Sequence, residues 1–121
     1  MRLSVIILTK NEESQIKGCL DSIKWTDEVI VVDSGSTDRT LEIAKRYNTK
    51  IFTDKGDDFS VKRNLGLEKT SGEWVFYVDA DERVTPELRE EIKSVISNQE
   101  AVVSAYKIPR KNFYFGNNEW P

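Results

Sequence analysis

The stretch Trp74-Val-Phe-Tyr-Val-Asp-Ala-Asp-Glu-Arg83 decides the fold of this chain. Five bulky residues with high β propensity are followed directly by two carboxylates one residue apart, the pattern of a buried strand that ends in a polar turn. Side chains alternate between the faces of a strand, so Asp79 and Asp81 would point the same way if the strand continued. Two such carboxylates repel each other unless a cation lies between them. The stretch therefore suggests a divalent metal site, with a simple polar turn as the alternative.

Length and composition describe one ordinary soluble domain. The chain has 121 residues, of which 38% are hydrophobic and 32% charged, and its net charge is −3. This balance, without a long basic run, argues against nucleic acid as a partner. A single cysteine excludes an internal disulfide, and the absence of histidine leaves acid–base chemistry to carboxylates. The apolar runs are too short for a membrane span, so the sequence predicts a cytoplasmic protein.

Outward from the opening stretch, apolar runs alternate with helical stripes. Strands are predicted at residues 3–8, 28–32, 50–53, 74–78 and 101–108. The helices between them are predicted to face inward through Ile16, Cys19, Leu20 and Ile23, through Leu41, Ala44 and Tyr47, through Val61 and Leu65, and through Leu88, Ile92, Val95 and Ile96. This alternation predicts an α/β fold, in which helices flank both faces of a mostly parallel sheet joined by right-handed crossovers.

Several residues predict where helices begin and end. Thr85-Pro86 is a helix start, with threonine as N-cap and proline at the first helical position. Gly72 is predicted to end the third helix in a left-handed conformation. The second helix is predicted to begin at a cap among Ser36, Thr37 and Asp38, and to stop at Asn48. Residues 112–121 are expected to form an aromatic-rich tail.

Polar clusters follow three of the predicted strands, at Thr9–Glu13, Asp33–Asp38 and Asp79–Asp81. Open α/β sheets bind ligands at the carboxyl ends of their strands, so these clusters are predicted to share one site. The Asp33 carboxylate is suited to accept from a ribose hydroxyl or a base N–H, and a helix-capping turn residue is the alternative. Lys62 and Arg63 could face phosphates or lie on a solvated helix face.

The chain contains no glycine-rich phosphate loop. Neither GxGxxG nor GxxxxGK[ST] occurs, which excludes dinucleotide-binding and P-loop functions. A phosphate ligand would therefore be held through a metal on Asp79 and Asp81.

Four ordered segments resemble the family-2 glycosyltransferases: residues 3–12, 28–38, 62–66 and 72–81. The continuation at residues 81–88, and residues 106–110 with Asn112, Phe113 and Gly116, are most similar to the bacterial lipopolysaccharide-core glucosyltransferase-like subgroup. The resemblance implies a Rossmann-like GT-A fold. It also implies that residues 1–121 form a single nucleotide-sugar-binding domain that ends before the acceptor-binding region.

The same resemblance implies an inverting hexosyltransferase. Its donor would be a nucleoside-diphosphate sugar, often a UDP-sugar, its cofactor Mg²⁺ or Mn²⁺, and its acceptor a saccharide or glycolipid such as the lipopolysaccharide core, reached at the inner face of the membrane. The nucleotide-sugar site would comprise Thr9, Asn11, Glu12, Asp33, Ser34, Arg63 and Asp79. Asp81, together with Asp79, would coordinate the metal. Family members take their catalytic base from the second half of the protein, so no base is nominated in this chain.

Two alternatives come from other classes. The first is a nucleotide-sugar-binding module without catalysis. The second is a response-regulator receiver domain, which has this length and a fivefold βα pattern. A receiver needs an acidic pair after its first strand and a phosphoacceptor aspartate after its third. This sequence has Asn11-Glu-Glu13 and Asp54 at these places, and Lys107 near the end is a looser match. The Asp79–Asp81 pair has no role in a receiver.

Overall fold

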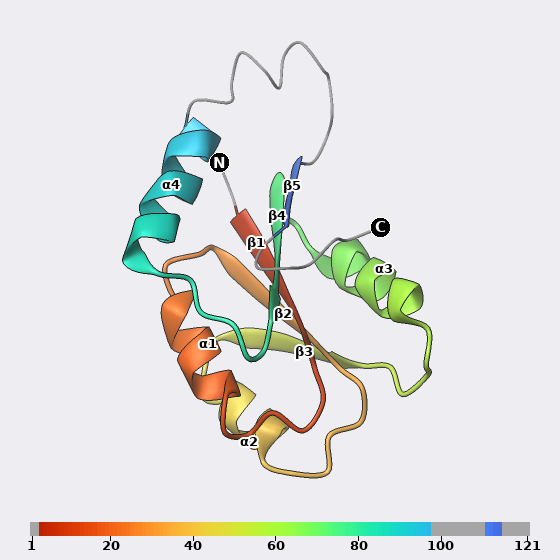
Figure 1. Cartoon of the computed structure of the whole chain (residues 1–121). Helices are drawn as coiled ribbons and strands as arrows, with labels where there is room; N and C mark the ends of the chain where they lie inside the picture. The colour runs from red at the N-terminus through yellow and green to blue at the C-terminus, as the bar shows by residue number, and fades with distance from the viewer. Residues whose placement is uncertain (1–2, 98–110, 115–121) are drawn as a thin grey trace.

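The computed structural model describes residues 3–97 and 111–114 of the chain (Figure 1). Its elements are β1 (Leu3–Thr9), α1 (Ile16–Ser22), β2 (Glu28–Asp33), α2 (Thr40–Ala44), β3 (Thr49–Thr53), α3 (Phe59–Lys69), β4 (Trp74–Asp79), α4 (Pro86–Ser97) and β5 (Lys111–Tyr114). The described strands form one parallel sheet in the order β3-β2-β1-β4-β5. The α/β fold predicted from the sequence is therefore confirmed.

β1 is the central strand, with β2 on one side and β4 on the other. Val5, Ile6 and Ile7 are completely buried, as expected for an apolar run covered on both faces. In the strand register, Thr9 lies opposite Asp33 and Leu8 opposite Asp79. The three strands therefore end together at the same edge of the sheet.

Helices cover both faces of the sheet (Figure 1). α1, α2 and α4 pack on one face, and their buried apolar side chains are Ile16, Cys19, Leu20, Ala44 and Ile92. α3 covers the other face, over a second cluster formed by Ile6, Ile30, Val32, Val75 and Tyr77. Within the described residues, no helix combines the length and apolarity that a membrane crossing requires.

α3 packs on the sheet through Lys62 and Gly66. The prediction that Val61 faces inward is wrong, because this side chain is 51% exposed, whereas Leu65 packs against the core as expected. A Cβ atom at Gly66 would lie 2.7 Å from Cγ2 of Ile6, so glycine allows the helix to approach the sheet closely. Lys62, one turn earlier, lies buried on the same face.

Two predicted helix boundaries need correction. α3 ends at Lys69, and the capping residue after it, Thr70, has an extended conformation. Gly72 is not left-handed, and its N–H donates to the Ser4 hydroxyl at 2.9 Å. α2 ends at Ala44, before the predicted Asn48. At its start, the Thr40 N–H donates to the carboxylate of Asp38, one of the predicted caps, at 2.9 Å. By contrast, the predicted start of α4 is confirmed, because the Thr85 hydroxyl accepts from the Leu88 N–H at 3.1 Å.

The last strand also differs from the prediction. The strand expected at residues 101–108 lies outside the described residues. β5 instead occupies Lys111–Tyr114, most of which was expected to belong to the aromatic tail. Phe113 and Tyr114 lie opposite Phe76 and Tyr77 of β4. Aromatic residues have a high β propensity, which favours a strand in this part of the tail.

Candidate functional site

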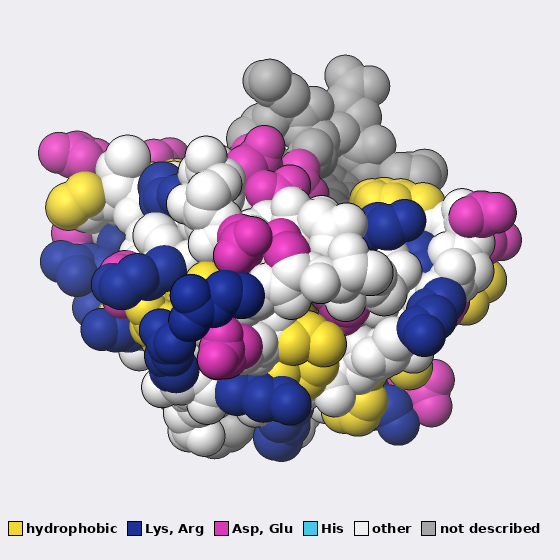
Figure 2. Space-filling model, turned by 90° about the horizontal axis from the view of Figure 1, so that it is seen from below, with side chains coloured by type: hydrophobic (Ala, Val, Ile, Leu, Met, Phe, Trp, Pro, Cys, Tyr) yellow, Lys and Arg dark blue, Asp and Glu magenta, His cyan; other side chains and the backbone are white. Residues whose placement is uncertain are grey.

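A cleft of about 380 Å³ opens at the carboxyl edge of the sheet. Its lining consists of Leu8, Thr9, Lys10, Glu12, Ser34, Asp57, Phe59, Lys62, Asp79, Ala80 and Asp81. The strand order reverses between β1 and β4, and the ends of these two strands, together with the segments that follow them, contribute more than half of the lining. Ligands of open α/β sheets bind at such a reversal. Figure 2 views the molecule from this edge, where acidic side chains gather near the centre and Lys and Arg groups lie mainly to the left.

The cleft contains five of the residues predicted to bind ligand: Thr9, Glu12, Ser34, Asp79 and Asp81. The other three, Asn11, Asp33 and Arg63, do not line it. Thr9 is only 4% exposed, and its hydroxyl has no hydrogen-bond partner among the described residues. Five of the eight predicted site residues thus lie together around the end of β1, and the other three lie outside the lining of the cleft.

The acidic pair lies at the end of β4. Asp79 is half-buried and Asp81 is exposed on the turn that follows. Within residues 3–97 and 111–114, neither carboxylate accepts a hydrogen bond or pairs with a cation. The same residues contain no group of three or more side chains that could hold a metal alone. Two free carboxylates fit Mg²⁺ or Mn²⁺, which take their remaining ligands from phosphate and water.

Asp33 uses its carboxylate to fold its own loop. Its Oδ2 accepts from the N–H groups of Gly35 and Ser36 at 2.9 and 2.8 Å, and its Oδ1 accepts from the Ser36 hydroxyl at 2.5 Å. Gly35 has a φ of 102°, which favours glycine. Asp33 therefore has the turn-forming role that the sequence left as an alternative. A carboxylate has about four acceptor positions, so a ligand contact stays a prediction.

The loops after β1 and β2 are joined by hydrogen bonds. Asn11 is left-handed, with a φ of 52°, and its side chain accepts from the Thr37 N–H at 2.8 Å. The Glu12 N–H donates to the Thr40 hydroxyl at 2.8 Å, and the Glu13 N–H donates to the Asp38 carboxylate at 3.2 Å. Asn11 therefore shapes the rim of the cleft from outside its lining.

Sequence reasoning left open whether Lys62 of α3 faces the ligand, and it missed Phe59, although both residues line the cleft. Phe59 is 49% exposed at the cleft, and Lys62 is buried, with its ammonium group donating to the Asp54 carbonyl oxygen. The Asp58 side chain caps α3 by accepting from the Ser60 N–H at 2.9 Å. Residues 59 and 62 are three apart and share a helix face. The three-residue spacing of Phe59 and Lys62, directly after the Asp58 cap, could have indicated that both residues face the cleft. A lysine on a helix is more often solvent-exposed, so this spacing was not given weight.

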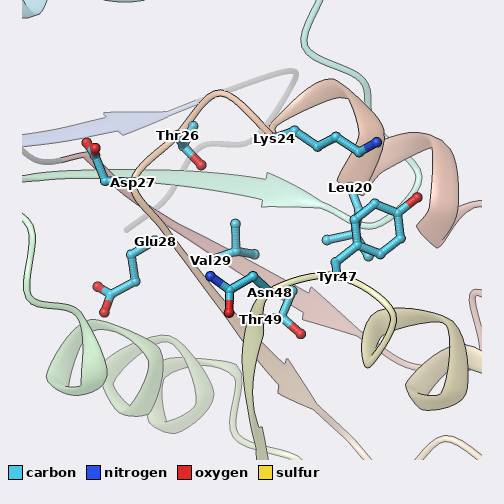
Figure 3. Close-up of a pocket in the computed structure, with 9 residues that line it drawn as sticks. All are labelled: Leu20, Lys24, Thr26, Asp27, Glu28, Val29, Tyr47, Asn48 and Thr49. Atoms are coloured by element: carbon cyan, nitrogen blue, oxygen red, sulfur yellow. The ribbon is translucent and has the colours of Figure 1, made fainter.

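A second cavity, of about 150 Å³, lies at the opposite edge of the sheet (Figure 3). Its lining consists of Leu20, Lys24, Thr26, Asp27, Glu28, Val29, Tyr47, Asn48 and Thr49. The Glu28 carboxylate turns away from Lys24 and Tyr47. It accepts from the Ser4 hydroxyl at 2.7 Å and the Ser71 N–H at 2.8 Å. These hydrogen bonds satisfy the buried carboxylate, so Glu28 has a structural role in the sheet.

Glu28 is expected to make stability depend on pH. Burial raises the pKa of Glu28, but hydrogen bonds from Lys50, Ser71 and Ser4 outweigh burial and lower this pKa to about 2. The folded pKa lies below the ordinary value of 4.5, so the carboxylate stabilises the fold above pH 4.5 and loses this effect as the pH falls towards 2. Because the Lys50 side chain is 63% exposed, we expect Glu28→Gln to lower the free energy of unfolding by only on the order of 2 kcal/mol at pH 7.

Urea denaturation at pH 7 and pH 3 measures this effect. The deficit of Glu28→Gln relative to the unmutated chain is expected to fall by about half or more at pH 3. Glu73→Gln, at an exposed position, is the matched control and should change little at either pH. An equal deficit of Glu28→Gln at both pH values would contradict the prediction.

The fold and the cleft together define a class of protein. A parallel sheet in the order β3-β2-β1-β4-β5, with the ligand cleft at its reversal, is the arrangement of nucleotide-binding α/β proteins. Receiver domains have the order 2-1-3-4-5, which places the third strand beside the first. Here β4 occupies that position, which excludes the receiver alternative.

The chain belongs to glycosyl transferase family 2, whose family model matches residues 4–121. It is 36% identical over 121 residues to an uncharacterized glycosyltransferase of Rickettsia typhi, covering 98% of this chain and 41% of that protein. It is 28% identical over 124 residues to the lipopolysaccharide core biosynthesis glycosyltransferase LpsC of Rhizobium meliloti, covering 98% and 46% respectively. The chain thus spans less than half the length of these curated relatives.

Solved structures of larger proteins share the fold. TarS of S. aureus in complex with UDP superposes with a TM-score of 0.69 at 32% identity, covering 82% of this chain and 33% of that one. Glucosyl-3-phosphoglycerate synthase of Mycobacterium tuberculosis, in complex with Mn²⁺, UDP and glucosyl-3-phosphoglycerate, gives a TM-score of 0.68 at 25% identity, covering 82% and 40%. The GT-A resemblance of the sequence is therefore confirmed.

Proposed function

We propose that this chain is the donor-binding part of a glycosyltransferase that takes its sugar from a UDP-sugar. The observation that carries the proposal is the pair of free carboxylates, Asp79 and Asp81, in the cleft at the strand reversal. A divalent cation bound there would offset the repulsion between the carboxylates and attract a diphosphate. Family membership and the presence of UDP in two similar structures support this choice of ligand.

The cleft has two sides, and we assign one to each end of the donor. The nucleoside would lie along the ends of β1 and β2, near Thr9, Glu12 and Ser34, over the loop that Asn11 and Asp33 shape. Arg63 lies farther along α3, outside the lining, and keeps its predicted nucleotide contact as part of the proposal.

The diphosphate would lie towards Asp79 and Asp81, which would hold Mg²⁺ or Mn²⁺. When bound, the cation supplies Lewis acidity to the departing diphosphate. Mn²⁺ is present with UDP in the mycobacterial synthase, which supports this part of the proposal.

The acceptor is proposed to be a saccharide or glycolipid of the lipopolysaccharide core. The likeness to LpsC, which is named for core biosynthesis, supports this class. Transfer with inversion needs a base on the face of the sugar opposite the diphosphate. We place that base outside this chain, and we place the enzyme in the cytoplasm at the inner face of the membrane, where it would meet a glycolipid acceptor.

Isothermal titration calorimetry tests the donor site directly. UDP is expected to bind at least about 10-fold more tightly with Mn²⁺ than without, because the paired carboxylates repel the diphosphate until a cation lies between them. Uridine, which has no phosphate, is the matched ligand control and should bind equally under both conditions. Equal UDP affinity with and without Mn²⁺ would show that the acidic pair is only a turn.

A further inference from the structure

The acidic turn after β4 rests on one face of α1. Its contacts fall on Gln15, Gly18, Cys19 and Ser22, which are spaced by three, one and three residues and therefore form a single stripe. The Cys19 thiol donates to the Asp79 carbonyl oxygen at 3.6 Å. The Val84 N–H donates to the Ser22 hydroxyl at 3.0 Å. The turn is thus attached to α1 at both of its ends.

Glu82 closes the turn internally. Its side chain accepts from the Asp79 N–H at 2.9 Å, and its own N–H donates to the Asp79 carbonyl oxygen at 2.9 Å. The described pairing of β5 with β4 ends at Tyr77, so Asp79 lies beyond the last β5 partner. Both backbone groups of Asp79 are therefore bonded, while its carboxylate stays available for a ligand.

Arg83 connects this turn to the loop after β1. One guanidinium nitrogen donates to the Glu82 carbonyl oxygen at 2.9 Å, and the other donates to the Gln15 side chain at 2.8 Å. The guanidinium lies over Gly18, where a Cβ atom would come within 2.4 Å of Nε. The Gln15 N–H in turn donates to the carbonyl oxygen of Glu12, a residue of the cleft lining, at 3.0 Å.

We propose that Arg83 is a positioning residue that fixes the Asp79–Asp81 turn relative to the Glu12 side of the cleft, and thereby raises the affinity for the cation. The proposal rests on the proposed function, because it concerns the same donor site. Arg83 acts through Gln15 and the Glu82 carbonyl group, to which both terminal nitrogens are bonded. It is therefore not assigned any contact with the donor.

The charge of Arg83 and its positioning role have opposite effects on cation binding. A guanidinium repels a nearby cation, so removing the charge alone would tighten metal binding, by only about twofold for charges about 8 Å apart in water. Loss of a group that orients a metal ligand typically weakens metal binding by about 10- to 100-fold. The direction of the change in an Arg83 variant therefore separates the two roles.

The test measures Mn²⁺ binding by electron paramagnetic resonance of the free ion at saturating UDP. Arg83→Met is expected to raise the dissociation constant of Mn²⁺ by about 10-fold. Gln15→Met, which retains the charge and removes the acceptor, is expected to raise it by about 3-fold or more, within the lower part of that range. Gln15→Glu keeps an acceptor for Arg83 and should restore affinity close to that of the unmutated chain.

Two further measurements separate positioning from general stability. Uridine binding, which needs no metal, should be unchanged in all these variants. Ser22→Ala removes the bond between α1 and the end of the turn at Val84, and it is expected to lower the melting temperature without changing Mn²⁺ affinity. If Arg83→Met fails to fold, the two Gln15 variants carry the test alone.

The outcomes are distinguishable. If the unmutated chain binds UDP equally with and without Mn²⁺, the proposed function fails and the positioning role with it. If UDP binding depends on Mn²⁺ but Arg83→Met and Gln15→Met bind Mn²⁺ as tightly as before or more tightly, only the positioning role is overturned. Parallel losses of uridine and Mn²⁺ binding would likewise overturn it, because they would show a folding defect.

Discussion

Replacing Asp81 with asparagine is expected to weaken Mn²⁺ binding in the presence of UDP by at least about 100-fold, since even indirect partners of a metal ligand contribute about 10- to 100-fold. Asp81 is exposed on the turn, and no bond to another described residue holds its carboxylate. The substitution therefore replaces one carboxylate oxygen with an NH₂ group and removes the negative charge, with little effect on stability. Calorimetry with UDP and Mn²⁺ measures the change, and uridine binding should be unaffected.

Asp57→Asn is the matched control for this experiment. Asp57 lines the same cleft from the side of α3, so the substitution removes one acidic charge from the cleft and leaves the acidic pair in place. Its expected effect on Mn²⁺ binding is limited to about twofold, that of a charge about 8 Å away in water which does not ligate the cation. If both variants lose affinity equally, the net charge of the cleft, and not ligation by Asp81, attracts the cation.

Acceptor-dependent sugar transfer by this 121-residue chain is expected to lie about 10²- to 10⁴-fold or more below that of a longer relative such as LpsC, because we assign no described residue as the base that deprotonates the acceptor. Asp79 and Asp81 are assigned to the metal, and the Glu82 carboxylate accepts from the Asp79 N–H. Glu87 lies in the first turn of α4, outside the cleft lining. Missing acceptor contacts would lower the rate further through lost positioning.

A labelled UDP-sugar, incubated with extracts that contain candidate lipid and saccharide acceptors, measures this transfer. Slow, acceptor-independent hydrolysis of the donor is expected to remain, since water can replace the acceptor while the cation still assists the departing diphosphate. Hydrolysis would also distinguish a disabled transferase from a pure binding module. Rapid transfer that depends on an acceptor would show that the base is within this chain, and Glu119→Gln would be the first variant to examine.

Much of the fold could be predicted because its signals are local. The apolar run of β1 indicated a strand buried on both faces, and Thr85-Pro86 marked the start of α4. The strand ends could be placed at one edge because parallel strands joined by helices all run in the same direction. For this reason Thr9 and Asp79 were expected in one cleft, and the structure places both of them there.

The errors arise where a side chain is used in a way that its polarity does not indicate. Val61 is apolar and exposed, whereas Lys62 is charged and buried, because α3 approaches the sheet through Gly66. Only the contact between Gly66 and Ile6 shows which face of α3 packs closely against the sheet. Asp33 presents the same difficulty, since a carboxylate that folds a loop and one that binds a ligand have the same sequence context.

The hydrogen bonds between the loops after β1 and β2 have a consequence for how the two ends of a donor would be recognised. The links from Asn11 to Thr37 and from Glu12 to Thr40 order this rim in the free protein, so binding a nucleoside there costs little conformational entropy. Asp81 lacks such links and loses side-chain freedom only when a cation binds. The part of the site that would recognise the base is therefore rigid before binding, whereas the part that would bind the diphosphate could adapt to cations of different size.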